Sequence, residues 1–328
     1  MREATFVRQN KDKWLKFERL VHNTFDCAPD ELSITYIELT EDLNYAQTFY
    51  PNSETTAYLN ELSVGIHQKI YTTKKESRHK IYRFYAYEFP LFFYQHRSVL
   101  LLAFIIFVGF SAIGAYSAAS DDGFVRLILG DAYVNSTLEN IQKGDPMAVY
   151  KKANEVDMFL GITLNNIKVA LYAFVAGIIA GLGTLFIVMQ NAIMLGSFQY
   201  FFYDQGLLWE SARTIWIHGT IEISVIIIAA TAGLVMGRSL LFPKTYTRLQ
   251  SFTQGVKAGL KIVISTIPFF ILAGFLEGFV TRLTHMPDGV AIFIIASSLV
   301  LVLYYYVVLP KLIYTNHARQ LHQFQKRT

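Results

Sequence analysis

The chain has 328 residues, of which 53% are hydrophobic, 15% aromatic and only 16% charged. Because ordinary soluble domains carry about 25% charged residues, this composition favours a membrane protein. A net charge of +4 gives no reason to expect nucleic-acid binding, and a single cysteine excludes an intrachain disulfide.

The first 97 residues have a different composition from the rest of the chain. They contain 13 basic and 13 acidic residues, a balance that is typical of a soluble domain. Apolar residues recur there at helical spacing in two places, with Trp14 and Phe17 in the first and Leu59, Leu62 and Ile66 in the second. We therefore expect residues 1–97 to form a cytosolic domain of three or four helices.

Aromatic and basic side chains crowd the last part of this domain, residues 78–97, whose sequence is RHKIYRFYAYEFPLFFYQHR. Rings beside basic groups favour the membrane–water interface, so we expect an amphipathic interfacial segment. The alternative interpretation is a buried aromatic helix of the cytosolic domain.

The remainder of the chain consists mainly of apolar runs long enough to cross a bilayer, which takes roughly 20 residues. The runs cover residues 98–119, 166–189, 191–207, 211–237, 258–281 and 289–313. They predict an all-α fold, a polytopic transmembrane bundle of about six spans over 98–315, followed by a basic cytosolic tail at 316–328. The alternative is five spans, with the short run 191–207 re-entrant.

Loop charge predicts the orientation of the bundle. The connection 120–163 has four basic and seven acidic residues, whereas 238–257 and the C-terminal tail have basic residues and no acidic ones. By the positive-inside rule, we expect 120–163 to lie outside and both termini to be cytoplasmic. The apolar residues within 120–163 suggest one or two short helices that dock a partner.

Four G-x-x-x-G pairs lie in or beside the apolar runs. Glycines one helical turn apart let helix backbones approach closely, which favours a compact bundle and leaves faces that suit a homo-oligomer. The pairs are Gly177/Gly181, Gly233/Gly237, Gly255/Gly259 and Gly274/Gly278.

His218 and Glu222 lie four residues apart inside an apolar run, Ile215 to Met236, that has no other ionisable residue. Four residues of helix return to nearly the same face, so both side chains point the same way. Ionisable groups at this depth are costly and usually face the interior of a bundle. The predicted orientation places them in the outer half of the bundle.

Other polar residues are expected near this pair. Glu277 closes the fifth predicted span at the outer end, and Asn165 or Asn166 opens the second, so these side chains are expected to join the cluster. Asn191 is expected at a sharp inner turn between the second and third spans. His285 is either a further partner or a solvated loop histidine.

Three roles for His218 and Glu222 remain open: a structural hydrogen bond, a site for a proton, ion or polar ligand, and catalysis. A zinc protease requires H-E-x-x-H and a third ligand, which this sequence lacks. It also lacks a nucleophile elbow, a Walker loop and a dinucleotide fingerprint in suitable context. We therefore expect no enzymatic activity, no catalytic residues, no cofactor and no metal.

Several of these stretches together resemble the stage II sporulation protein M family. They include Asn165-Asn166, the segment from Asn191 to Gly196, His218-Gly219-Thr220-Ile221-Glu222, and the segment from Gly233 to Gly237. The N-terminal stretch FVRQNKDKWLKFERLV resembles the opening helix of that family, so the resemblance extends over nearly the whole chain. A proline often precedes the histidine in the family, whereas this chain has Ile217.

The resemblance implies a polytopic inner-membrane protein. In spore-formers, the family member acts during engulfment in a complex that recruits peptidoglycan-degrading enzymes, while many relatives occur in organisms that form no spores. We therefore expect a non-enzymatic scaffold that assembles other membrane or envelope proteins within the lipid bilayer. The alternative is a transporter or channel subunit that uses the buried His/Glu site.

The predicted orientation is directly testable with reporter fusions. We expect a reporter at the C-terminus to be active only as a cytoplasmic fusion, and a reporter at Asn140 only as an external one, because of the loop charges described above. An external C-terminus would support the five-span alternative.

Overall fold

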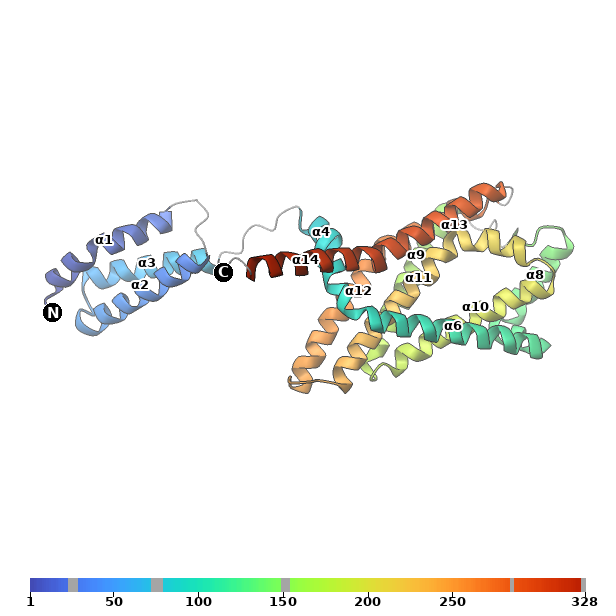
Figure 1. Ribbon diagram of the computed structural model, residues 1–328, viewed down its shortest axis with the longest axis horizontal. Helices are drawn as coiled ribbons and strands as arrows, with labels where there is room; N and C mark the ends of the chain where they lie inside the picture. The colour runs from blue at the N-terminus through green and yellow to red at the C-terminus, as the bar shows by residue number, and fades with distance from the viewer. Residues whose placement is uncertain (23–28, 72–78, 149–153, 284–285, 326–328) are drawn as a thin grey trace. The chain divides into compact units, whose positions relative to one another are not determined.

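A computed structural model describes residues 1–22, 29–71, 79–148, 154–283 and 286–325 of the chain. Contacts divide the chain into two compact units, Met1–Lys80 and Ile81–Thr328. Within the described ranges every regular element is a helix, which confirms the predicted all-α fold (Figure 1).

Unit 1 contains three helices, α1 (Glu3–His22), α2 (Pro29–Phe49) and α3 (Glu54–Tyr71). Trp14 and Phe17 are buried, as their spacing predicts, and the indole of Trp14 donates a hydrogen bond to Asp42 at 2.8 Å. The core of the unit is completed by Phe6, Leu39, Leu43, Ala46, Leu59, Leu62 and Ile66.

A nearly continuous helical run starts at Lys80, the last residue of unit 1, and forms the first part of unit 2. It comprises α4 (Lys80–Arg83), the π-helix η1 (Phe84–Glu88), α5 (Phe89–Phe93), the 3-10 turn η2 (Tyr94–His96) and α6 (Arg97–Ser120). Two short helices, α7 (Asp122–Leu129) and α8 (Asp131–Gln142), follow, as expected for this connection. The remaining elements are α9 (Glu155–Val175) with the 3-10 turn η4 (Ala176–Ile178), α10 (Leu182–Asp204), α11 (Leu208–Leu241), α12 (Arg248–Phe275) with the π-helix η5 (Leu276–Thr281), α13 (Asp288–Leu303), the π-helix η6 (Tyr304–Val308) and α14 (Leu309–Gln325).

Among the described residues, six helical stretches are long and apolar enough to cross a membrane. They cover Lys80–Ser120, Glu155–Ile178, Leu182–Asp204, Leu208–Leu241, Arg248–Thr281 and Asp288–Arg319. This confirms a helical membrane bundle of about six spans. α10 is a continuous helix of 23 residues rather than the short segment that the five-span alternative required.

The connection between the second and third spans lies in a different place from the one predicted. The turn was predicted at Asn191, but the chain turns at 179–181, where Ala180 and Gly181 have positive φ values of 50° and 85°. Apolar residues continue through this turn without a polar break, so hydropathy does not reveal it. Both spans consequently begin earlier than expected, and α9 starts at Glu155, before the expected loop end at residue 163.

α11 is the central helix of unit 2 and contacts α6, α9, α10, α12 and α13. In its most apolar window, 72% of the residues are buried, compared with 22% for the span that contains α6 and 17% for the span that contains α13. His218 of α11, which is 4% exposed, is therefore enclosed by protein, while α6 and α13 are peripheral.

Glycines allow the spans of unit 2 to pack closely. A Cβ on Gly177 would collide with the backbone of Gly233, and a Cβ on Gly237 with that of Gly181, so two of the G-x-x-x-G pairs face each other between the end of the α9 span and α11. The pairs Gly255/Gly259 and Gly274/Gly278 also lie against neighbouring helices. All four G-x-x-x-G pairs therefore contact other helices of the same chain.

α6 and α10 meet through two further glycines. A Cβ on Gly114 of α6 would collide with the backbone of Ile193, and a Cβ on Gly196 of α10 with the backbone of Ser111. The two helices therefore pack backbone to backbone.

The aromatic segment before α6 packs on unit 2. Phe89 and Phe93 are fully buried and meet the ring of Tyr306 of η6 edge to face. The Tyr85 hydroxyl donates to the carbonyl of Ile264 at 2.9 Å. Residues 81–97 therefore belong to unit 2 by their contacts, and the boundary between the units precedes the predicted boundary at residue 97.

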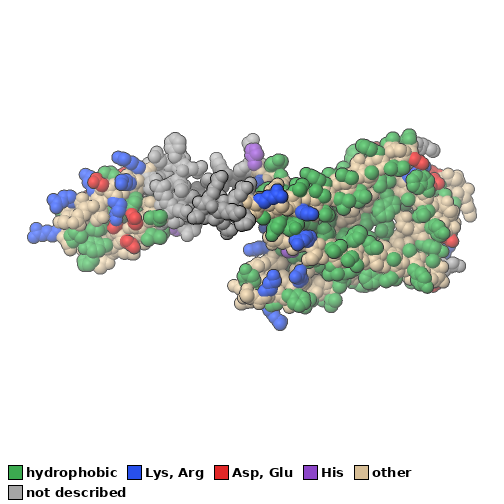
Figure 2. Space-filling view, in the orientation of Figure 1, with side chains coloured by type: hydrophobic (Ala, Val, Ile, Leu, Met, Phe, Trp, Pro, Cys, Tyr) green, Lys and Arg blue, Asp and Glu red, His purple; other side chains and the backbone are tan. Residues whose placement is uncertain are grey.

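The two ends of unit 2 differ in charge. The basic end carries Arg97 and the turn at 242–247, and the acidic end carries α7, α8 and the connection before α13. Figure 2 shows Lys and Arg side chains gathered at the first end and acidic ones near the second. At the acidic end, α7 and α8 cover the ends of the spans through a core formed by Ala118, Val125, Val134, Met147, Phe201, Phe202 and Ile215.

A matched pair of substitutions in α6 tests the glycine packing. We expect Gly114→Ala to destabilise the detergent-solubilised protein by about 1–3 kcal/mol, because the added methyl group must displace the backbone of α10. Gly109→Ala, on the same helix with open space around it, should change stability by less than about 1 kcal/mol. Denaturation followed by circular dichroism measures both, and equal effects would contradict the packing described here.

Candidate functional site

Three ionisable side chains meet inside unit 2: His218 and Glu222 from α11, and Glu277 from η5. Their ligand atoms, one nitrogen and two carboxyl oxygens, all lie within 4.8 Å of one another. His218 is only 4% exposed, and its Nε2 lies 3.7 Å from Oε2 of Glu277. We call these three residues the HEE cluster.

Thr281 fixes the orientation of the His218 ring. The Thr281 hydroxyl donates its proton to the carbonyl of Leu276 at 3.2 Å, and its oxygen lies 2.9 Å from His218 Nδ1. The contact between Thr281 and Nδ1 holds the ring so that the other ring nitrogen, Nε2, faces Glu277.

Sequence analysis did not identify Thr281. Its signal is the spacing of four residues from Glu277, which on a helix places two side chains on the same face. Both residues lie in η5, a π-helical turn at the end of the α12 span. Such turns are rare and occur frequently at functional sites.

The two predicted asparagines have different positions. Asn166 is 4% exposed and interacts with the Glu222 carboxyl group, although its Nδ2 has no partner at hydrogen-bonding distance. One turn earlier on α9, the hydroxyl of Thr163 is also buried without a partner. Asn165 is exposed and does not face the cluster.

Asn191 is not at a turn and is not part of the HEE cluster. It lies in the middle of α10, where its side-chain amide donates to the carbonyl of Ile187 at 2.8 Å. The prediction placed it wrongly because the turn itself was misplaced. His285 lies outside the described residues.

The arginines closest in sequence to the cluster bind other carboxylates. Arg282, directly after η5, pairs with Glu155 at 3.1 Å, and Arg213 pairs with Asp288 at 2.8 Å. Both pairs lie at the acidic end of unit 2 and are partly exposed.

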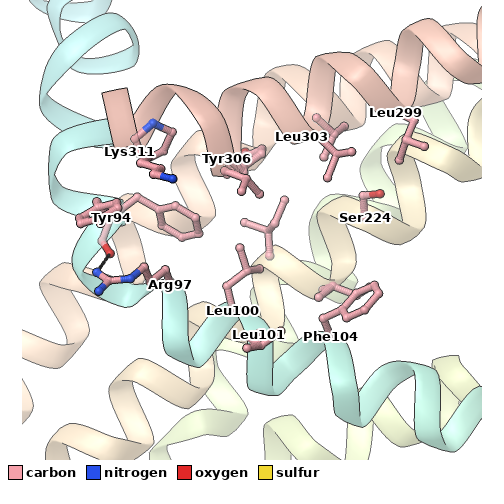
Figure 3. A pocket seen from close by; sticks show the side chains of 16 residues that line it. Tyr94, Arg97, Leu100, Leu101, Phe104, Ser224, Leu299, Leu303, Tyr306 and Lys311 are labelled. Carbon is pink, nitrogen blue, oxygen red and sulfur yellow. Dashed lines mark hydrogen bonds between the residues drawn. The ribbon is translucent and has the colours of Figure 1, made fainter. Parts of the chain in front are cut away.

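A second candidate site is a groove of about 580 Å³ between α6, α11 and the α13–α14 run (Figure 3). Its walls are apolar, and several wall residues are about half exposed, among them Leu101 at 59% and Leu303 at 47%, so the groove opens to the outside of the bundle. Arg97 and Lys311 lie at the basic end of the groove.

The groove and the HEE cluster lie on opposite faces of α11. Ser224 and Ile227 line the groove. At 3.6 residues per turn, Ile227 lies opposite His218, and Ser224 lies opposite Glu222. A substitution in the cluster can therefore be made without touching the groove.

The chemical capacities of the two sites differ. An imidazole beside two carboxyl groups can hold a proton or a cation in a water-poor interior. An apolar groove with a cationic end can hold an apolar chain or a row of side chains with an anionic group at one end.

Comparison with known sequences gives two family matches. The family described as Stage II sporulation protein M matches residues 103–282, which contain α9 to η5 and the whole HEE cluster. A different family, described as a domain of unknown function (DUF8413), matches residues 4–72 in unit 1. The opening helix therefore matches another family than the one that sequence analysis expected.

One curated relative is an uncharacterized protein of Methanocaldococcus jannaschii, MJ0706. It is 26% identical over 147 residues, which are 44% of this chain and 65% of the relative. The chain therefore covers slightly less than two thirds of that protein. No solved structure shows a significant similarity to the chain.

The family match covers more than half of the 328 residues, and the fold is the membrane bundle that the resemblance implied. The chain is thus a membrane protein that belongs to the stage II sporulation protein M family.

Proposed function

We propose that this protein is a non-enzymatic scaffold of the cytoplasmic membrane that assembles other membrane or envelope proteins. The observation that carries the proposal is the groove beside α6 and α13, on the periphery of a bundle whose central helix is enclosed. An enclosed central helix, α11, with exposed faces on the peripheral helices α6 and α13 suits a protein that binds partners.

The size of the groove indicates how a partner binds. A transmembrane helix is about 10–12 Å wide and 30 Å long, so a groove of about 580 Å³ accepts one row of its side chains rather than the whole helix. In lipid, helices associate through such packing because there is no hydrophobic driving force between them. An acidic residue at the end of the partner helix would pair with Arg97 or Lys311.

Unit 1 offers a second attachment point. It has its own core and matches a family of its own, so it is built as a separate module on the same chain. A module joined to a membrane bundle supports a protein that links partners.

A transporter or channel subunit is the second candidate function. The HEE cluster favours it, because two carboxyl groups and a histidine at membrane depth are typical of proton and ion pathways. The two functions make opposite predictions for a variant that removes one charge from the cluster.

A photo-crosslinking residue in the groove tests the scaffold. In native membranes, we expect the label at Leu303 to give a protein adduct of defined mass, because a partner helix lies against it. The control is the same label at Ile271 of α12, which is 45% exposed compared with 47% for Leu303. Adducts with lipid alone at Leu303, or equal protein adducts at both positions, would refute the proposal.

Glu222→Gln separates the two functions. We expect this variant to insert, to keep the Leu303 adduct at wild-type yield and to cause no change in ion flux, since Glu222 faces away from the groove and an amide can still contact Asn166. Adduct yield and flux in reconstituted vesicles are measured on the same preparation. A folded variant that abolishes a wild-type flux would favour the transporter instead.

A further inference from the structure

Lys168 of α9 places a charged side chain near the middle of a membrane span. The span covers Glu155–Ile178, and its last acidic residue is Asp157. Lys168 is the middle residue of the stretch 158–178, with about 15 Å of helix on each side at 1.5 Å per residue. Because the hydrocarbon core of a bilayer is about 30 Å thick, the lysine comes near the centre of a membrane that this span crosses.

The side chain of Lys168 has no partner among the residues that the structure describes. It is exposed on the outside of unit 2, and no ion pair, hydrogen bond or ring contact engages its ammonium group there. By comparison, the ammonium group of Lys261 in α12 lies 5.1 Å from the ring centre of Phe92. A charged group at membrane depth is costly, and it normally pairs with an opposite charge or faces the interior of a bundle. Within the described chain, Lys168 does neither.

The membrane surface is out of reach for this lysine. Lysines near the ends of spans extend along the helix to the interface. Side chains on a helix lean toward its N-terminus, which for Lys168 means toward Glu155, about 20 Å away along the helix. A stem of four methylene groups is much shorter than that distance. The charge therefore calls for a counter-charge at membrane depth rather than for a lipid phosphate at the surface.

Lys168 belongs to a polar stripe on the outer face of α9. Gly161, Asn165, Lys168 and Tyr172 follow one another at spacings of four, three and four residues, so they fall within about 60° of one another around the helix. All four are exposed, whereas Ala170, on the opposite face, is buried. This spacing is the one by which two helices pack along a seam. We call these four residues the α9 stripe.

Gly161 gives the α9 stripe room for a close approach. A Cβ added to Gly161 would meet nothing within 4 Å, whereas a Cβ on Gly177 of the same span would collide with the backbone of α11. Small residues let helix backbones approach each other in lipid, and amide side chains such as that of Asn165 form hydrogen bonds between helices. The features of a helix-packing face are thus present where no described helix of this chain packs.

We propose that the α9 stripe binds a transmembrane helix of another protein that carries an Asp or Glu side chain near its own midpoint. The carboxylate pairs with Lys168, the partner backbone approaches at Gly161, and Asn165 forms a hydrogen bond across the contact. This inference rests on the scaffold function and specifies one class of partner for it. The α9 stripe is separate from the groove, whose walls are α6, α11 and the α13–α14 run.

A second copy of this chain does not supply the carboxylate. In a dimer with a two-fold axis along the membrane normal, the two stripes would place Lys168 against Lys168, and like charges repel. Within the described spans, Glu222 is the one carboxyl group in the middle of a helix, and it faces the HEE cluster. The other carboxyl groups of these spans lie near their ends. The charge therefore points to a different protein.

Site-specific photo-crosslinking in native membranes tests the proposal. A label in place of Tyr172, which is 64% exposed, should give a protein adduct, and the captured protein should have Asp or Glu in the middle of a transmembrane helix. Lys168→Leu should lower the adduct yield by about 10-fold, the size expected for one interhelical polar contact. Lys168→Arg keeps the charge and should retain the adduct.

A control label and a charge exchange make the test specific. Phe293 of α13 is aromatic, 71% exposed and outside the groove walls, so any adduct formed there should not change in Lys168→Leu. Replacing the carboxylate of the captured helix with lysine should abolish the Tyr172 adduct. Combining that change with Lys168→Glu should restore it, because the ion pair is then rebuilt in the opposite sense.

The groove label at Leu303 separates failure of this proposal from failure of the scaffold function. A protein adduct at Leu303 with none at Tyr172 would overturn the α9 proposal alone, and the absence of both would overturn both. Wild-type adduct yield in Lys168→Leu, a captured helix without a central acidic residue, or an adduct with a second copy of this chain would also overturn it. An unchanged Leu303 yield in Lys168→Leu confirms folding, and Lys168→Gln gives the same comparison if the leucine variant does not insert.

Discussion

The architecture of unit 2 depends on the cost of placing ionisable groups at membrane depth. α11 carries His218 and Glu222 within an otherwise apolar sequence, and lipid contact with these groups would cost several kcal/mol. The fold avoids this by enclosing α11 with helices on several sides, so that 72% of its apolar window is buried. The carboxyl group of Glu277, another costly group, is placed against the same helix.

Close packing around α11 requires small residues, because hydrophobic association does not drive helices together in lipid. Glycines supply the contacts between the α9 span and α11 and between α6 and α10. α13 lacks such contacts: the glycine at its start, Gly289, has open space around it, and most of the helix is bulky and exposed. The groove therefore lies where close glycine packing is absent. The enclosed HEE cluster and the open groove both follow from which helices carry glycines at their contacts.

Much of the fold and of the HEE cluster was predictable from the sequence. Long apolar runs predict spans, and the i, i+4 spacing of His218 and Glu222 predicts a shared helix face. Placing Glu277 and Asn166 near them required only the direction of each span. The buried face of unit 1, with Trp14 and Phe17, followed from helical periodicity.

The features that were missed depend on backbone geometry that periodicity does not record. The turn at Ala180 and Gly181 is hidden because its neighbours are as apolar as the spans, and Asn191 was consequently misplaced. Thr281 reaches His218 through a π-helical turn, which changes the register of η5 relative to the regular helix before it. The groove involves helices that are distant in the sequence.

The enclosed HEE cluster depends on the contact by which Thr281 of η5 holds the His218 ring of α11. The most direct measurement is the ¹⁵N spectrum of the histidines in lipid bilayers, with His218 assigned by comparison with His218→Gln. Because Thr281 Oγ1 lies 2.9 Å from His218 Nδ1, the structure predicts that the Nδ1 signal of His218 shifts in Thr281→Val while the other histidine signals stay unchanged. A His218 signal that Thr281→Val leaves unchanged would contradict this account.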